Sequence, residues 1–367
     1  MNKKRILKCG VPVLLTLVLI LGLTACAADT NSSAEAPAPV EDAPAPVEEV
    51  ANTDPIIEEV ANTDPIIIVY YPNESAGVWE DARNAFGDII TAATGRPVEH
   101  MLTTDYIIAI EAIAQGTADL AYMGPTGYLI ANEINPAVIP LVVNTGASGT
   151  LDDAVYFGWF AVLVENADDF RGADGEFDFD LIEGRSMTFV TPTSTSGFVI
   201  PMGAIAEHFG EDRISDDYIL DGDFFSDVQM GGSHQGSTMN LLMGATEIAA
   251  FADTVLAPYI ELVSGEHNAA GAVYRIVDGV EPPFHTHIGV EFILIESVPV
   301  LNPPWAVNTN NFTQDEIDAM RALLIDDSTT NNQLIFGSED FDGHPWFPRT
   351  AYERFVVIED SWFDAMR

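Results

Sequence analysis

The chain has 367 residues and carries 57 acidic against 14 basic side chains, which gives a formal net charge of −43 at pH 7. A charge of this sign argues against nucleic acids and anionic lipid surfaces as partners, because both are themselves negative. The two cysteines, Cys9 and Cys26, both lie near the N-terminus, which excludes a disulfide framework in the rest of the chain. The fold must therefore be stabilised by a hydrophobic core.

The first 26 residues are predicted to form an export signal. Four basic residues precede an apolar run at 11–23, which is too short to span a bilayer. The run ends in Leu-Thr-Ala-Cys at 23–26, which resembles the bacterial lipobox and implies cleavage before Cys26 and lipidation of its sulfur. More than one acyl chain gives durable attachment, so we expect an extracytoplasmic protein anchored to the cell membrane. A plain signal peptide followed by a chance cysteine is the alternative.

Residues 27–64 are low in complexity and are predicted to form a disordered tether. A segment at 36–41 recurs at 43–48, and a longer one at 48–57 recurs at 58–67. Proline-rich, acidic sequence buries little apolar surface and repels itself, which keeps such a segment extended. The globular part is expected to begin near the end of the second repeat.

Beyond the tether, apolar strands and amphipathic helices alternate. A helix is expected to start at Ser75, to bury a stripe that includes Trp79 and Phe86, and to end at Gly95. Asp105 is expected to cap the next helix. Strand–helix–strand at this spacing is typical of parallel βαβ units. The expected elements of this part are strands at 65–71, 97–102 and 119–123, helices at 75–94 and 105–116, and a helix that opens with Pro125.

The same alternation resumes in the second half of the chain. Near the end, Thr313 and Glu316 have the spacing of a capping box in front of an amphipathic stripe. Two α/β lobes joined by crossing strands fit this layout. The expected elements are strands at 186–191 and 247–252 and helices at 197–209 and 235–243, and the expected lobes are 65–162 with 288–367 (lobe 1) and 163–287 (lobe 2).

One segment places several hydroxyl groups at an expected helix start. Thr193–Phe198 follows a strand and offers Ser194, Thr195 and Ser196 beside the unpaired N–H groups of a helix N-terminus. Gly197 would let the backbone approach a ligand closely. Such a site suits a tetrahedral oxyanion and needs no lysine. An ordinary Ser/Thr helix cap would have the same sequence.

Two further segments contain candidate ligand-binding residues. His234 lies in Gly232–Ser237 at a helix start, and its ring can donate a hydrogen bond or, when protonated, supply a charge. Tyr106 follows Asp105, where its hydroxyl would face a cleft between the lobes. A histidine satisfied within its own loop and a tyrosine buried in the core are the alternatives.

Together these segments resemble the phosphonate-, phosphite- and phosphate-binding proteins of ABC importers. The similarity runs through blocks at 105–125, 194–201 and 232–247, in the family's order, and covers about 66–300. It implies a type II periplasmic-binding-protein fold, an α/β fold in which each of two lobes is a mostly parallel sheet flanked by helices, with the ligand cleft between them. It also implies a monomeric binding protein, not an enzyme, without cofactor or metal, that delivers a small oxyanion to permease subunits.

The resemblance assigns roles by motif position. It implies that Tyr106, Ser194, Thr195, Ser196 and His234 hold the phosphorus oxygens. Because the whole protein is strongly negative, capture would depend on short, desolvated hydrogen bonds.

The chain departs from the family pattern at two places and matches it only loosely at a third. Trp159 stands where the family often has a tyrosine in the crossing strand, so an indole N–H would replace a hydroxyl. Relatives that bind aminoalkylphosphonates use acidic residues for the amine, and Asp253 is the nearest match. The segment 282–287 lacks an expected acidic residue and has His285 and His287 instead.

Three other interpretations remain open at this point. Ser196, His234 and Asp253 could form a hydrolytic triad, but the Gly-x-Ser-x-Gly elbow is missing. His285 and His287 would share one face of a strand and could bind a metal together with His267 or Glu291. A sensor could replace the permease as the partner of the same oxyanion site.

Overall fold

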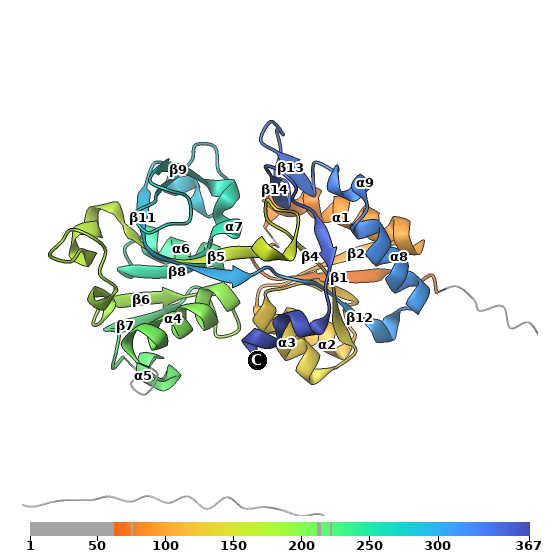
Figure 1. The fold of residues 1–367 in the computed structure, drawn as a ribbon, viewed down its shortest axis with the longest axis horizontal. Helices are drawn as coiled ribbons and strands as arrows, with labels where there is room; N and C mark the ends of the chain where they lie inside the picture. The colour runs from red at the N-terminus through yellow and green to blue at the C-terminus, as the bar shows by residue number, and fades with distance from the viewer. Residues whose placement is uncertain (1–61, 75, 211–213, 221) are drawn as a thin grey trace, which may run out of the picture. The chain divides into compact units, whose positions relative to one another are not determined.

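The computed structural model describes residues 62–74, 76–210, 214–220 and 222–367. The predicted export signal, Cys26, nearly all of the predicted tether and Ser75 lie outside these residues. Within the described residues, no helix is long and apolar enough to cross a membrane. The same residues form two large sheets with helices on their faces and a small two-stranded sheet (Figure 1).

The sheet of the first lobe has six strands: β1 (Ile66–Tyr70), β2 (Val98–Leu102), β3 (Leu120–Tyr122), β4 (Val138–Asn144), β12 (Trp305–Asn308) and β15 (Phe355–Val357). Their order is β15-β4-β12-β3-β1-β2. β1 pairs in parallel with β2 and with β3, as expected for consecutive βαβ units. β12 is antiparallel to β3 and β4, and β15 is antiparallel to β4.

The sheet of the second lobe has seven strands: β5 (Val155–Leu163), β6 (Ser186–Phe189), β7 (Asp227–Met230), β8 (Ile248–Ala252), β9 (Ile260–Ser264), β10 (Val273–Ile276) and β11 (Glu291–Leu301). Their order is β7-β6-β8-β5-β11-β10-β9. β6 is parallel to β7 and β8, whereas the pairs that involve β5, β10 and β11 are antiparallel.

The two-lobed α/β fold is confirmed, but both sheets are mixed rather than mostly parallel. The reason is the path of the chain between the lobes. β5 enters the second sheet and β11 leaves it, so these two strands run in opposite directions and pair along their length. β12 then re-enters the first sheet antiparallel to its neighbours.

The same pairing locates the connections between the lobes. The lobe boundaries expected at 162–163 and 287–288 lie at the end of β5 and just before β11, which would place both strands in lobe 1. Both strands instead pair within the sheet of the second lobe. The chain changes sheet near Ala154 and Asn302, where the Asn302 N–H donates to the Ala154 carbonyl at 3.0 Å.

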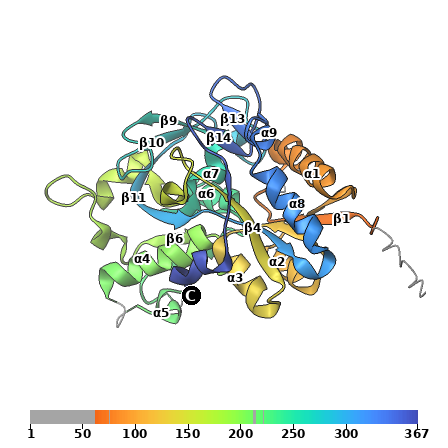
Figure 2. The same ribbon diagram turned by 45° about the vertical axis from the view of Figure 1, so that its right-hand side comes forward.

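Helices cover both faces of the first sheet. They are α1 (Glu80–Thr94), α2 (Tyr106–Gln115), α3 (Pro125–Ile134), α8 (Gln314–Leu324) and α9 (Asp327–Thr330). α1 and α8 bury Phe86 and Met320 in one cluster, and α2 and α3 bury Ile110 and Tyr128 in another. In both views α1 and α8 lie above the sheet and α2 and α3 below it (Figure 2).

The second sheet is covered in the same way. Its helices are α4 (Ile200–Phe209), α5 (Asp216–Leu220), α6 (His234–Leu242) and α7 (Asp253–Leu256). Leu241 of α6 and Leu256 of α7 share a core cluster with Trp159, whereas Ile205 of α4 packs with Phe160 on the opposite face. β13 (Phe336–Ser338) and β14 (Phe347–Arg349) form the small parallel sheet.

The local signals of the sequence are confirmed at several helix ends. Asp105 caps α2 by accepting from the Ile107 N–H, and Pro125 is the first residue of α3. Thr313 and Glu316 form the expected capping box. The first expected helix instead begins with a 3₁₀ turn at Gly77–Trp79 that leads into α1.

Candidate functional site

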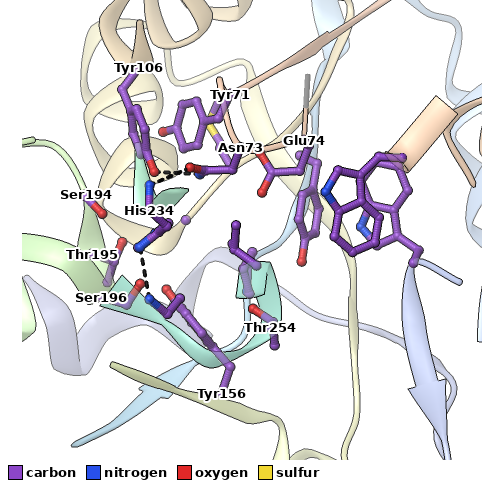
Figure 3. A pocket seen from close by; sticks show the side chains of 18 of the residues that line it. Tyr71, Asn73, Glu74, Tyr106, Tyr156, Ser194, Thr195, Ser196, His234 and Thr254 are labelled. Carbon is purple, nitrogen blue, oxygen red and sulfur yellow. Dashed lines mark hydrogen bonds between the residues drawn. The ribbon is translucent and has the colours of Figure 1, made fainter. Parts of the chain in front are cut away.

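A pocket lies between the two lobes, at the carboxyl ends of β1 and β3, where ligands of α/β sheets commonly bind. It leaves about 50 Å³ for the centres of water-sized molecules, several times the ~10–15 Å³ that one water needs. The described residues that line it are Tyr71, Asn73, Glu74, Trp79, Tyr106, Tyr122, Met123, Gly124, Tyr156, Ser194, Thr195, Ser196, His234, Ala252, Thr254, Val255, Pro303, Trp346 and Phe347 (Figure 3).

The predicted hydroxyl segment reaches this pocket. Thr195–Val199 forms a π-helical turn that leads into α4, and the Ser194 hydroxyl accepts a hydrogen bond from the Gly197 N–H at 3.2 Å. Ser194, Thr195 and Ser196 are all buried and all line the pocket. The turn packs closely on β5, since a Cβ at Gly158 would lie 2.8 Å from the Ser196 carbonyl oxygen.

Gly197 serves packing rather than access to a ligand. It is absent from the described lining, and a Cβ at this position would lie 2.2 Å from Val190 Cγ2. Its carbonyl also accepts from the Val190 N–H at 3.0 Å. The glycine therefore lets the turn fold back onto the end of β6.

Thr195 links the lobes directly. Its hydroxyl oxygen accepts from the Thr126 N–H at 2.9 Å, which satisfies one of the free N–H groups at the start of α3. A Cβ on Gly124 would lie 2.8 Å from the same oxygen. The close approach of the lobes at this point thus needs glycine at 124.

Asn73 makes a second set of contacts between the lobes. Its side-chain N–H donates to the Tyr106 hydroxyl at 2.6 Å, and its side-chain carbonyl accepts from the main-chain N–H of His234 at 2.9 Å. The Tyr106 ring stacks on Tyr71 with 4.0 Å between the ring centroids. Burial raises the pKa of Tyr106, so its hydroxyl keeps its proton.

His234 is the first residue of α6, and Ser233 caps that helix. Its Nδ1 accepts from the Ala252 N–H at 3.0 Å, so in the neutral ring the proton is on Nε2. Burial lowers the pKa of His234 to about 3. At neutral pH His234 is therefore an uncharged donor, not a cation.

These groups share one property. Thr195, Tyr106, Ser194 and the His234 ring each accept a hydrogen bond from an amide N–H. Each group accepts from a fixed amide and still carries a proton of its own, and the Tyr106 hydroxyl also interacts with Ser194. We call Tyr106, Tyr156, Ser194, Thr195, Ser196 and His234 the hydroxyl end of the pocket.

Tyr156, and not Trp159, lines the pocket from β5. Trp159 is fully buried in the core, where its indole N–H donates to Asn268 Oδ1 at 2.8 Å and its ring stacks on Tyr274. The hydroxyl of Tyr156 interacts with Ser196, and burial raises the Tyr156 pKa. The chain therefore does carry an aromatic hydroxyl from the crossing strand, three residues earlier than expected.

Asp253 also lies outside the described lining. One carboxylate oxygen accepts from the Phe157 N–H at 3.1 Å and from the Thr254 N–H at 2.7 Å, and the other accepts from the Asn268 side chain at 3.2 Å. Burial raises its pKa to about 6, and these hydrogen bonds oppose that shift. Asp253 joins α7 to β5, while its neighbour Thr254 lines the pocket.

Sequence reasoning missed an acidic residue that does line the pocket, Glu74. It lies four residues after the end of β1, and the rule that ligands bind at the carboxyl ends of parallel strands could have indicated it. Burial raises the Glu74 pKa to about 8. Its carboxyl lies on the other side of Asn73 from Ser194–Ser196 (Figure 3). We call Glu74 and the aromatic residues Trp79, Tyr122, Trp346 and Phe347 the aromatic end.

The geometry does not support the hydrolase interpretation. A triad needs the carboxylate to accept from the histidine, whereas His234 Nδ1 itself accepts from Ala252 N–H. The carboxylate of Asp253 is engaged by Phe157, Thr254 and Asn268.

The metal interpretation depends on a strand that contains His285 and His287, and this expected strand is wrong. His285 lies in a 3₁₀ turn at Phe284–Thr286 and His287 directly follows it, because β11 begins only at Glu291. Over the part of the chain that the structure describes, no group of three His, Cys, Asp or Glu side chains is arranged to hold a metal ion.

Comparison with known proteins agrees with this architecture. The phosphate-import protein PhnD of Mycolicibacterium smegmatis is 31% identical over 114 residues, which are 31% of this chain and 33% of the relative. The alignment thus spans about a third of that relative's length.

Two solved structures share the fold, each with a TM-score of 0.58 over 83% of this chain. One is a binding protein component of an ABC phosphonate transporter from Pseudomonas aeruginosa, at 14% identity and 85% coverage of that chain. The other is PhnD1 from Prochlorococcus marinus in complex with methylphosphonate, at 15% identity and 96% coverage. Residues 68–363 match the family described as ABC transporter, phosphonate, periplasmic substrate-binding protein. The chain therefore belongs to this family of substrate-binding proteins.

Proposed function

We propose that the protein binds a phosphonate, phosphite or phosphate at the hydroxyl end and delivers it to an ABC permease. The observation that supports this best is the set of donor groups that are each oriented by a hydrogen bond from an amide. Thr195, Tyr106 and the His234 ring each accept from an amide and so direct a proton elsewhere. A tetrahedral phosphoryl group, with oxygens that only accept, complements such a site.

The site would bind an anion without cationic side chains. The described lining contains neither lysine nor arginine, and His234 is neutral. Hydrogen bonds from neutral donors to a charged oxygen contribute about 1.5–3 kcal/mol each, so several of them suffice for micromolar binding. The negative charge of the whole protein would slow the encounter but not weaken these short contacts.

Closure of the lobes would complete the site. Ser194, Thr195, Ser196, Tyr156 and His234 belong to the second lobe and Tyr106 to the first, so a ligand held by all of them joins the lobes. The bonds of Asn73 and Thr195 across the pocket would add to the stability of this closed form.

The activities of the relatives support the same ligand class. The mycobacterial relative is a phosphate-import protein, and the cyanobacterial structure contains methylphosphonate. We further propose a monomeric protein held extracytoplasmically by a lipid on Cys26. Labelled fatty acid should appear on the wild-type protein and disappear in Cys26→Ser; labelling of both would refute the anchor.

A thermal-shift screen tests the ligand. Phosphate, phosphite, methylphosphonate, sulfate and arsenite are added to the purified protein, because a ligand of the folded state raises its melting temperature by mass action. We expect at least one phosphorus oxyanion to stabilise the protein more than sulfate does. If sulfate matches or exceeds every phosphorus compound, the proposed function is wrong.

A further inference from the structure

The aromatic end contains a buried carboxyl group that the hydroxyl end does not use. Glu74 is 8% exposed, and its Oε2 has no hydrogen-bond partner among the described residues. The nearby Arg83 guanidinium donates to the main-chain oxygens of Glu74 and Ala76. A buried carboxyl oxygen without a partner is costly, so a ligand group that complements it would gain affinity.

Aromatic rings from distant segments gather beside this carboxyl in the lining. Tyr122 and Trp346 are 5.4 Å apart between ring centroids with their planes at 89°, and Trp79 lies 5.9 Å from Trp346. Phe347 lies 6.1 Å from Tyr122 at 68°. Rings at such angles form a corner rather than a flat wall. Aromatic faces next to a carboxyl attract organic cations.

The charges of the pocket favour a ligand that carries its own positive group. A phosphonate dianion would introduce negative charge near Glu74, and the described lining offers no cationic side chain against it. A zwitterion would place its phosphoryl group at the hydroxyl end and its cation at the aromatic end. A cation beside Glu74 would favour the ionised form of this carboxyl, whose pKa burial raises to about 8, and would then be attracted to it.

The polar atoms of the aromatic end distinguish between kinds of cation. A primary ammonium group has three N–H donors, each of which needs an acceptor when buried. The Tyr122 hydroxyl already shares a hydrogen bond with the Trp346 side chain, and the Trp79 indole N–H can only donate. Glu74 is left as the acceptor, and one carboxyl group does not provide acceptors for three N–H groups. An alkylated nitrogen has fewer N–H groups, or none, and therefore fits this end better.

We propose that the aromatic end binds an N-alkylated ammonium group, so that the preferred ligands are phosphonates with a substituted, cationic amino substituent. This inference rests on the proposed function of the hydroxyl end. The raised pKa of Glu74 supports it, because burial outweighs the opposing effects of the Asn73 side chain and the Arg83 charge, and a bound cation would add to those opposing effects.

The test compares ligands that differ at one end. Calorimetry on the wild-type protein uses 2-(trimethylammonio)ethylphosphonate, its uncharged isostere 3,3-dimethylbutylphosphonate, 2-aminoethylphosphonate and methylphosphonate. We expect the trimethylammonium compound to bind at least about tenfold more tightly than its isostere and more tightly than the primary amine. Equal binding of compound and isostere, or a preference for the primary amine, overturns the proposal.

A pair of variants identifies the residue responsible. Glu74→Gln should reduce the preference for the cation over its isostere to about threefold or less, whereas Asp253→Asn should keep it, because Asp253 is outside the described lining. A preference that survives in Glu74→Gln overturns the role of Glu74. Methylphosphonate separates the two proposals: failure to bind it, along with every other phosphorus oxyanion, refutes the function, whereas binding it without any cation preference refutes this inference alone.

Discussion

The two ends of the pocket solve different physical problems. At the hydroxyl end, main-chain and side-chain amides fix the orientation of donors, so little has to rearrange when an anion arrives. At the aromatic end, Glu74 Oε2 and the Trp79 indole N–H have no hydrogen-bond partner among the described residues. The hydroxyl end therefore favours tight binding of an anion. The aromatic end favours ligands whose substituent can interact with these unpartnered atoms.

The largest effect is expected from removing donors at the hydroxyl end. Tyr106→Phe and Ser196→Ala should each weaken binding of the best phosphorus oxyanion about tenfold or more, since each loses a hydrogen bond to a charged oxygen. Isothermal titration calorimetry measures the change. Unchanged affinity in both variants would mean that this end does not hold the ligand.

A smaller effect should distinguish two aromatic residues of β5. Tyr156→Phe should weaken binding about fivefold, because its hydroxyl belongs to the hydroxyl end. Trp159→Phe should leave affinity within about twofold and lower the melting temperature, because it loses the bond to Asn268. If Trp159→Phe weakened binding more than Tyr156→Phe, Trp159 rather than Tyr156 would contact the ligand.

The pH dependence of stability should reveal the neutral His234. Its pKa is lowered from 6.5 to about 3 on folding, so the unfolded chain binds the extra proton more readily. Its contribution is present above pH 6.5 and is lost as the pH falls towards 3, by at most about 1.4 kcal/mol per pH unit.

His234→Asn provides the matched control, because the asparagine oxygen can still accept from the Ala252 N–H. Glu74 and Asp253 have raised pKa values and act in the opposite direction, but they are common to both proteins. Denaturant melts between pH 6.5 and 4 should show a steeper loss of stability in the wild type. Parallel curves would show that His234 is not buried in its neutral form.

The smallest effect is expected at Asp253. Asp253→Asn keeps an oxygen for the Phe157 and Thr254 N–H groups, so affinity for a phosphorus oxyanion should stay within about twofold. A loss of tenfold or more in calorimetry would show that Asp253 contacts the ligand.

Much of the hydroxyl end could be predicted because its signals are local. Three hydroxyl residues in a row, at a helix start after a strand, form a pattern that needs no knowledge of tertiary contacts. Helix caps such as Asp105 are local for the same reason. Motif position places Trp159 where the family has its tyrosine, but which residues of β5 face the pocket depends on the pairing of β5 with β8 and β11, which motif position does not show.

The aromatic end could not be predicted as a unit. Glu74 and Trp79 follow β1, Tyr122 ends β3, and Trp346 comes from the C-terminal part of the chain. No spacing in the sequence relates these positions, and each aromatic residue alone reads as core. Only the packing of the first lobe brings them together around the pocket.

The close contact of Gly124 with Thr195 has a consequence for the spacing of the lobes. The separation of the lobes at this point is limited by a single hydroxyl oxygen that meets one main-chain amide. The lobes cannot approach more closely at this contact, and the methyl group of an alanine at 124 would collide with the Thr195 hydroxyl oxygen. Gly124→Ala would therefore hold the two lobes further apart at this contact or displace the Thr195 hydroxyl.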